Sequence, residues 1–306
     1  MKVLIAGSTG LVGSAVVESM QKTNHELLTP KHSELDLLDR DAVRKYLRAQ
    51  NPDLVIHCAG IVGGIMINRK EQVRFMLENL DMGKNLIHES FLAGVKKFIN
   101  LGSSCMYPRN SERPLTEDMI LTGELEPTNE GYAIAKIACE RLCEFISREN
   151  PAFQYKTIIP NNLYGKNDKF KTENAHMLPA VIHKIHVAKM NGQSSIEIWG
   201  TGQVRREFFY SGDFGDLISY CVENFDRLPS VMNAGTGIDF TIDQYYQAVA
   251  KVVGYEGQFT HDTSKPEGMT RKLLDVSKLK EFGWTAKTDL ETGIRKTYEF
   301  YLEHEI

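Results

Sequence analysis

The chain begins Met1-Lys2-Val3-Leu4-Ile5-Ala6-Gly7-Ser8-Thr9-Gly10-Leu11-Val12-Gly13-Ser14, and this stretch decides the fold. Its continuous apolar run from Val3 to Ala6 is typical of a buried strand in a parallel sheet. Three glycines spaced G-x-x-G-x-x-G follow, and then a segment of helical character. Such glycines let the backbone turn tightly and approach a pyrophosphate, whose charge is met by N–H groups at the next helix start. The stretch predicts a dinucleotide site; the alternative is an ordinary glycine-rich turn between strand and helix.

Strands and helices alternate along the first half of the chain. Apolar runs predict further strands at residues 26–29, 53–60, 97–101 and 155–159. The segments between them predict helices at 14–23, 39–50, 72–92 and 131–147. This repeat predicts an α/β fold with a doubly wound parallel Rossmann sheet.

The simple alternation ends after residue 165. Residues 166–175 are polar and loop-like, 196–202 predict a strand and turn, and 238–306 predict two helices around a basic loop at 265–272. We therefore expect a Rossmann domain made of 1–165 with 207–237. A smaller α/β substrate-binding domain, made of 166–206 with 238–306, is expected to close a cleft over the carboxyl edge of the sheet.

The bulk composition limits the classes of partner. The 306 residues are 42% hydrophobic and 25% charged, as in soluble globular proteins, and the net charge of −4 argues against nucleic acid or an acidic membrane. The five cysteines show neither a disulfide framework nor a C-x-x-C metal site, and we expect no bound metal. Because no leader sequence and no apolar run near the ~20 residues of a membrane span are present, we expect a cytoplasmic protein.

The end of the second predicted strand bears on the choice of cofactor. NAD enzymes usually carry an Asp or Glu there for the ribose 2′-hydroxyl. This chain has Thr29-Pro30-Lys31-His32-Ser33 instead. The missing acid and the available cation favour a 2′-phosphate, and so NADPH over NADH. The alternative is that Lys31 and His32 belong to a solvated turn.

One predicted helix carries a pair of residues suited to carbonyl reduction. Tyr132 and Lys136 stand at i and i+4, so both project from one face. A nearby cation is expected to lower the pKa of the Tyr132 phenol toward neutrality, and the phenol would donate a proton to a carbonyl oxygen. Ser103 or Ser104, at the end of the preceding strand, would polarise the same carbonyl. Taken alone, the pair is a common accident of helical spacing.

These residues together resemble a known family. The glycine loop, the strand-end serine and Y-x-x-x-K at Tyr132 resemble the extended short-chain dehydrogenase/reductases. The resemblance narrows, over nearly the whole chain, to the GDP-L-fucose synthases. The segments that narrow it are Val62-Gly63-Gly64-Ile65, Ser103-Ser104-Cys105-Met106-Tyr107-Pro108, Glu126-Pro127-Thr128-Asn129-Glu130, Asn174-Ala175-His176-Met177-Leu178-Pro179 and Arg271-Lys272-Leu273-Leu274-Asp275-Val276.

The resemblance implies an NADPH-dependent 3,5-epimerase and 4-reductase acting on GDP-4-keto-6-deoxy-mannose. Protons on C3 and C5 lie next to a ketone and can be removed if the enolate is stabilised. By resemblance, Cys105 is the base and His176 the acid, and Tyr132, Lys136 and Ser103 serve both the enolate and the reduction. Without the resemblance, Cys105 would be read as a small buried residue and His176 as a residue at a helix start.

The resemblance also assigns binding residues and a quaternary state. It implies cofactor contacts from Gly7, Thr9, Gly10, Leu11, Val12, Gly13, Lys31, His32, Asp36, Leu37, Ala59, Gly60, Lys136, Pro160, Leu163 and His176. It implies GDP-sugar contacts from Ser104, Asn162, Lys184, Trp199, Arg206 and Lys272. The sequence does not decide whether Arg205 or Arg206 points into the cleft. A homodimer paired through residues 72–92 and 132–148 is expected.

Other functions stay open at this point. One keeps the C4-reductase without the epimerase, or acts on a related GDP-4-keto-6-deoxy-sugar or GDP-4-keto-heptose in surface-polysaccharide synthesis. Another is a non-catalytic dinucleotide-binding regulator. The presence of Tyr132, Lys136, Ser103 and Cys105 speaks against a regulator, because a sensor does not need proton-transfer groups.

Overall fold

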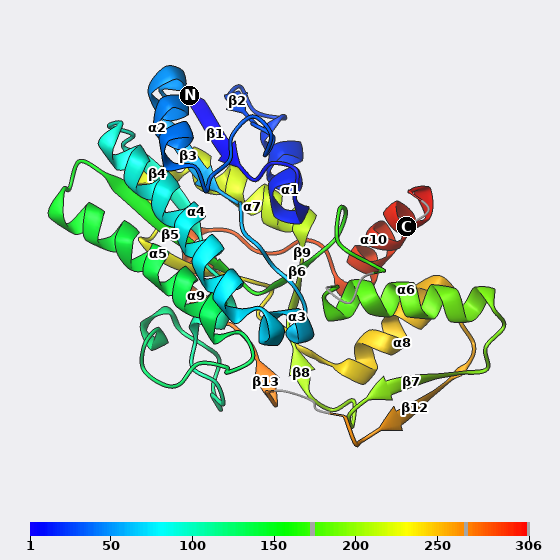
Figure 1. The fold of residues 1–306 in the computed structure, drawn as a ribbon. Helices are drawn as coiled ribbons and strands as arrows, with labels where there is room; N and C mark the ends of the chain where they lie inside the picture. The colour runs from blue at the N-terminus through cyan, green and yellow to red at the C-terminus, as the bar shows by residue number, and fades with distance from the viewer. Residues whose placement is uncertain (172–174, 266–268, 305–306) are drawn as a thin grey trace.

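A parallel sheet forms the centre of the computed structural model, which describes residues 1–171, 175–265 and 269–304 (Figure 1). Its strand order is β10-β5-β4-β3-β1-β2, and every pairing is parallel. The strands are β1 (Lys2–Ala6), β2 (Glu26–Leu28), β3 (Leu54–His57), β4 (Lys97–Leu101), β5 (Gln154–Pro160) and β10 (Val231–Ala234). The predicted doubly wound Rossmann sheet is confirmed.

Helices cover both faces of this sheet, which explains why its strands read as continuous apolar runs. On β1, Val3 and Ile5 belong to one hydrophobic cluster, whereas Leu4 and Ala6 belong to another. The first cluster includes α1 (Leu11–Met20) and α7 (Ser211–Glu223); the second includes α2 (Arg40–Gln50), α4 (Gln72–Leu92) and α5 (Glu130–Glu149). Alternate side chains of a buried parallel strand therefore meet helices on opposite sides.

The predicted boundaries of the helices and strands agree best with the structure at α4 and β4. The predictions for α4 and β4 match the structure residue for residue. The prediction of a first helix at 14–23 is wrong, because α1 begins at Leu11 and ends at Met20. Extended Gly10 starts the helix, its carbonyl accepts from the Ser14 N–H, and Gly13 lies inside the first turn. Because glycine has a low helix propensity, a prediction based on propensity places the start of the helix after the glycines.

Residues after 161 build further elements beyond the carboxyl edge of the sheet (Figure 1). A hydrophobic cluster unites α6 (Met177–Met190), β7 (Ser195–Trp199), α8 (Ile242–Val253) and α10 (Leu290–Glu303), and β12 (Gln258–Asp262) pairs with β7 in parallel. The prediction of two helices in 238–306 is wrong, since the described part also contains α9 (Ser277–Phe282). Leu279 and Phe282 of α9 pack into a core of the central sheet instead.

Short strands connect the two regions. β6 (Asn162–Tyr164) pairs with β9 (Phe208–Tyr210), and β8 (Arg205–Arg206) lies between β11 (Phe240–Thr241) and β13 (Arg271–Lys272). These strands were not predicted, because two- and three-residue strands are too short to show a period. A short helix, α3 (Ile65–Lys70), and three 3-10 turns at Ser104–Met106, Glu117–Met119 and Phe225–Arg227 complete the described elements.

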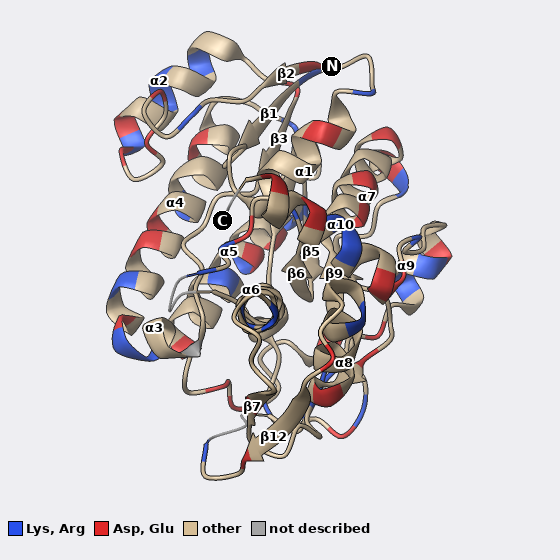
Figure 2. Ribbon diagram, turned by 90° about the vertical axis from the view of Figure 1, so that its right-hand side faces the viewer, with Lys and Arg blue, Asp and Glu red and all other residues tan. Residues whose placement is uncertain are grey.

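Charged side chains lie along the outer helices: those of α2 are mostly basic, and α4 carries both signs (Figure 2). Buried Glu89 of α4 is held by Arg40 and Arg44 of α2, with nitrogen–oxygen distances of 2.6 and 2.9 Å. Among the described residues, no helix is both long and apolar enough to cross a membrane.

A buried histidine at the end of β3 gives a testable prediction about acid stability. Burial lowers the pKa of His57 to about 3, with a smaller effect from the Lys136 charge. Folded His57 stays neutral while the unfolded chain takes up a proton below about pH 6.5, so this contribution to stability is present above that pH and is lost as pH falls. Between pH 7.5 and 4.5, we expect the unfolding free energy of His57→Asn to fall by about 2–3 kcal/mol less than that of the wild type.

Denaturant titrations at the two pH values measure this difference. Exposed His32→Asn is the matched control, and its pH dependence should equal that of the wild type. An unchanged dependence in His57→Asn would show that this imidazole does not limit acid stability.

Candidate active site

The glycine loop lies where the strand order of the sheet reverses, between β1 and β3. Gly7 has a φ of +82°, and a Cβ placed on it would lie 2.5 Å from the Ala59 backbone nitrogen. A Cβ on Gly13 would lie 2.0 Å from the Gly7 carbonyl oxygen. Because glycine stands at the start of α1, no side chain of that residue accepts from the first N–H groups of the helix. This loop therefore has the close backbone approach and the open helix N-terminus that a pyrophosphate requires.

The other predicted cofactor residues lie around this crevice in different ways. Exposed Lys31 and His32 follow β2, and the Ser8 hydroxyl donates to the carbonyls of Thr29 and Pro30 at 3.3 and 3.5 Å. The glycine loop thus contacts the turn that leads to Lys31. Leu37 is buried in the core, and Asp36 accepts from the Leu38 N–H at 2.9 Å. Pro160 ends β5, and Leu163 lies in the adjoining strand β6.

Ser103 and Tyr132 are in direct contact at the carboxyl end of β4. Their hydroxyls are hydrogen-bonded, and the Ser103 hydroxyl also accepts from the Cys105 N–H at 3.3 Å. Ser104 is turned away: it is buried, and its hydroxyl donates to Asn161 at 3.2 Å. Of the two serines, Ser103 has the geometry to share a carbonyl oxygen with the Tyr132 phenol.

The expected lowering of the Tyr132 pKa is wrong. Burial raises the pKa of Tyr132, the nearby Cys105 raises it further, and only the hydrogen bond with Ser103 lowers it. Lys136 instead donates to the Leu101 carbonyl at 3.0 Å, and its nitrogen lies 5.8 Å from the Tyr132 ring centre. Burial also lowers the pKa of Lys136. The phenol therefore keeps its proton at neutral pH, which suits a proton donor.

Polar groups from two separate elements converge on the sulfur of Cys105. The Asn129 amide nitrogen donates to this sulfur at 3.0 Å, and the Lys272 ammonium lies 3.6 Å from it. His176 stands at the start of α6, where burial lowers its pKa and the charges of Lys169 and Lys272 add to this effect. Lys272 thus contacts Cys105 and also acts on His176. Asn174, in the same sequence motif as His176, lies outside the described residues.

Strand register answers the open question about the two arginines. β13 pairs with β8 so that Arg271 faces Arg205 and Lys272 faces Arg206. Arg205 and Arg271 both bind the Asp239 carboxylate on one side of this small sheet, with distances of 2.9 and 2.5 Å. Because neighbouring residues of a strand point to opposite sides, Arg206 shares its side with Lys272, which reaches Cys105. Arg206 is the arginine on the cleft side.

The remaining predicted substrate residues lie farther out along the late elements. Lys184 of α6 donates to the Glu197 carbonyl on β7, and Trp199 at the end of β7 is 58% exposed. The Lys265 ammonium lies 5.7 Å from the centre of the Trp199 ring. Asn162 donates from its side chain to the Glu207 carbonyl at 3.1 Å.

Buried Glu207 organises the floor of the site and was not predicted. Its carboxylate accepts from the Thr236, Gly237 and Leu274 N–H groups, at distances of 2.6, 2.8 and 3.0 Å, and from the Asn161 side chain. Burial nevertheless raises its pKa. Through Asn161 it reaches Ser104, and through Leu274 it fixes the chain just after Lys272. An acidic residue directly after two arginines reads as a surface charge, so the sequence hides this role.

Asn79 is a second residue that sequence reasoning missed. It is buried on α4, its side-chain oxygen accepts from the Ile61 N–H at 2.9 Å, and its amide donates to the Ile61 carbonyl at 3.1 Å. These bonds fix the loop that follows Ala59 and Gly60. A polar residue on the buried face of an amphipathic helix is the signal that could have identified it.

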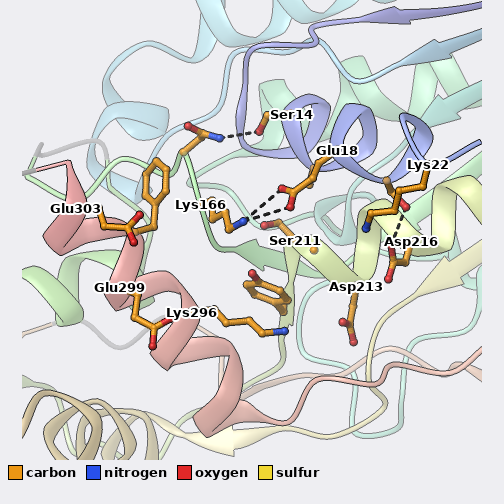
Figure 3. A pocket seen from close by; sticks show the side chains of 16 residues that line it. Ser14, Glu18, Lys22, Lys166, Ser211, Asp213, Asp216, Lys296, Glu299 and Glu303 are labelled. Carbon is orange, nitrogen blue, oxygen red and sulfur yellow. Dashed lines mark hydrogen bonds and ion pairs between the residues drawn. The ribbon is translucent and has the colours of Figure 1, made fainter. Parts of the chain in front are cut away.

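A cavity of about 530 Å³ lies elsewhere, between α1, α7 and α10 (Figure 3). None of the predicted catalytic residues lines it. Charged and polar side chains on its wall bind one another, as Lys166 does to Glu18 at 3.3 Å and Ser19 does to Asp216 at 2.7 Å. Of the predicted catalytic residues, Ser103 lies instead just after the carboxyl end of β4.

Comparison with known proteins identifies the family of the chain. Residues 3–235 match the model of the NAD dependent epimerase/dehydratase family. The chain belongs to this family. It is 51% identical over 302 residues to a GDP-L-colitose synthase of Yersinia pseudotuberculosis, covering 99% of this chain and 98% of that protein. It is 44% identical over 301 residues to a GDP-L-fucose synthase of Azorhizobium caulinodans, covering 98% and 96%.

A solved structure extends the agreement to the fold. The GDP-mannoheptose C4 reductase MlghC of Campylobacter jejuni, solved with NADP bound, has a TM-score of 0.89 and 34% identity, with 98% of both chains covered. The predicted resemblance and the oxidoreductase class of this family are confirmed.

Proposed function

We propose that this protein is an NADPH-dependent epimerase and reductase of a GDP-4-keto-6-deoxy-mannose-type sugar, giving GDP-L-fucose or a close analogue. One observation carries the proposal: Ser103, Tyr132, Cys105 and Lys272 are linked by contacts at the strand edge beside the glycine loop. The GDP-sugar synthases at 51% and 44% identity support the substrate class.

The residues present fit a dinucleotide with a 2′-phosphate. Gly7, Gly10 and Gly13 would hold the pyrophosphate at the start of α1, and Lys31 and His32 would face the 2′-phosphate. The relative solved with NADP supports this choice. When bound there, NADPH supplies the hydride that reduces C4.

The residues of the chain account for the proton transfers. Cys105 takes the proton from the carbon next to the ketone, so that a C–H bond breaks and an S–H bond forms. Tyr132 and Ser103 donate hydrogen bonds to the enolate oxygen, and His176, as the acid, delivers a proton to the opposite face of that carbon. In the reduction, Tyr132 gives its proton to the C4 oxygen, and the positive charge of Lys136, 5.8 Å from the Tyr132 ring centre, favours the phenolate that remains.

A second candidate product is GDP-L-colitose, favoured by the 51% identity. Colitose lacks the C3 hydroxyl of fucose, so the two products differ in which carbons are stereocentres. A third candidate, C4 reduction without epimerisation, is favoured by the reductase at a TM-score of 0.89.

A direct assay separates these candidates. The purified protein is mixed with NADPH and either GDP-4-keto-6-deoxy-mannose or its 3-deoxy counterpart, and the product is identified by NMR. We expect NADPH oxidation with both compounds, and inverted C5 in each product. A product with C5 unchanged would leave only the reductase, and no NADPH oxidation with either compound would overturn the proposal.

The domain division, quaternary state and location are also proposals. We infer a Rossmann domain of 1–165 with 207–237 and a sugar-binding domain of 166–206 with 238–306, supported by the separate hydrophobic cluster of the late elements. All five cysteines are free thiols, which suits a cytoplasmic enzyme. The helices α4 and α5 carry exposed apolar side chains, namely Val73, Leu77, Ile134 and Phe145, which supports a homodimer formed through them.

The dimer gives a prediction with a large effect on assembly. Leu77 is 51% exposed on α4, one turn from Val73. We expect Leu77→Glu to weaken the dimer at least about 100-fold, because each new carboxylate must lose its hydration in an apolar contact. Sedimentation velocity measures the shift to monomer. Leu302→Glu, an equally exposed site on α10, should leave the dimer intact, and a dimer unchanged by Leu77→Glu would rule out this face.

A further inference from the structure

Asn129 begins α5 without capping it. Asparagine is favoured at the start of a helix because its side-chain oxygen accepts an N–H of the first turn. In this chain Asn129 has φ −139° and ψ 25°, and its side chain makes no such bond. Its backbone carbonyl still accepts from the Ala133 N–H at 3.0 Å, so the residue is fixed to the helix. Its side chain is therefore available for contacts outside the helix.

The two ends of the Asn129 amide have different surroundings. Its nitrogen donates to the Cys105 sulfur at 3.0 Å. Its oxygen is buried and has no hydrogen-bond partner. A neutral thiol is a weak acceptor, whereas a thiolate is a charged one that binds donors strongly. A buried amide whose oxygen stays unsatisfied costs free energy, so its N–H bond to the sulfur is expected to serve the site.

The same sulfur receives a second donor from a distant part of the chain. The Lys272 ammonium on β13 lies 3.6 Å from it. Asn129 also stands three residues before Tyr132 on α5, and Tyr132 is bonded to Ser103, which in turn holds the Cys105 N–H. Asn129 thus closes a ring of contacts that sets where the sulfur lies relative to the phenol.

We propose that Asn129 is the positioning residue of the epimerase base: its amide N–H holds the Cys105 thiolate in line with the proton to be removed. This inference rests on the proposed function. When the sulfur takes the proton from carbon, the amide N–H remains bonded to it, so the base does not rotate away before the proton is passed on.

Replacing Asn129 by Ser tests the inference with little risk to the fold. Serine caps helices as well as asparagine does, but it has no amide to bind the sulfur. The first readout is deuterium incorporation at C3 and C5 of GDP-4-keto-6-deoxy-mannose in deuterated water without NADPH. We expect the exchange rate to fall about 10- to 100-fold, because a misplaced base loses most of its advantage. The second is the rate at which iodoacetamide alkylates Cys105, followed by peptide mass spectrometry, which should fall as well.

Matched variants distinguish a loss of Cys105 positioning from a loss of the folded structure. Exposed Glu130→Gln, the next residue, should keep wild-type exchange and alkylation. Asn129→Asp has the same shape but places a carboxylate against the sulfur, so its alkylation should need a higher pH than that of the wild type. If Asn129→Ser does not bind NADPH, which shows a failure to fold, Asn129→Asp decides by the same readouts.

The outcomes distinguish this inference from the proposed function. A wild-type protein that exchanges no deuterium overturns the epimerase part of the proposed function and this inference with it. Wild-type exchange together with equal exchange and equal alkylation in the Asn129 variants overturns the inference alone. Loss of exchange and of alkylation in the variants, with NADPH binding kept, supports it.

Discussion

Replacing Tyr132 by Phe is expected to lower the rate of NADPH oxidation about 1,000-fold or more, because reduction of the ketone needs a proton at the C4 oxygen. The phenol is bonded to Ser103, and burial keeps its pKa raised, so it is protonated at neutral pH and ready to donate. Phenylalanine preserves the ring and its packing but removes the proton. Stopped-flow absorbance at saturating substrate measures the change in kcat.

A matched tyrosine and a binding assay make the result specific. Tyr46→Phe on α2 is distant from the site and should keep the wild-type kcat. NADPH should bind Tyr132→Phe with nearly wild-type affinity, as followed by its fluorescence. A Tyr132→Phe variant with near wild-type kcat would remove this residue from the chemistry.

Replacing Cys105 by Ser is expected to lower deuterium exchange at C3 and C5 about 100-fold or more, because a serine hydroxyl ionises far less readily than a thiol and so supplies almost no anionic base. The serine can still accept from Asn129 and Lys272, so the surroundings of the site should be kept. Exchange in deuterated water without NADPH, read by NMR, measures the effect.

The control for this variant is a cysteine outside the site. Cys221 is buried on α7 in a core of the sheet, and Cys221→Ala should exchange at the wild-type rate. Persistent exchange in Cys105→Ser would assign the base to another residue.

The fold could be predicted because its strands are buried on both faces. Continuous apolar runs such as Val3 to Ala6 predict buried strands, and the sustained helical periodicity of α4 predicts a long helix. The glycines after β1 mark the crevice at which the strand order of the sheet reverses. The connecting strands β6, β8, β9, β11 and β13 escaped prediction because they are only two or three residues long. Their pairing depends on contacts between residues far apart in sequence, such as Arg206 with Lys272.

In the site, too, features set by residues close in sequence could be predicted, whereas contacts between distant segments could not. The pair Tyr132 and Lys136 follows from helical spacing, but spacing does not reveal that Lys136 binds the Leu101 carbonyl or that burial dominates the pKa of Tyr132. The choice between Arg205 and Arg206 needed the register of β8 with β13. Asn129 and Glu207 look like ordinary polar residues in the sequence, and only the folded chain places them against Cys105 and Asn161.

The most direct test of the account is the isotopic composition of the product formed in deuterated water with unlabelled NADPH and GDP-4-keto-6-deoxy-mannose. The account predicts one solvent deuterium at C3, one at C5 and ordinary hydrogen at C4, because protons pass through Cys105 and His176 whereas the C4 hydrogen does not come from water. A reduced product with no deuterium at C3 and C5 would contradict it.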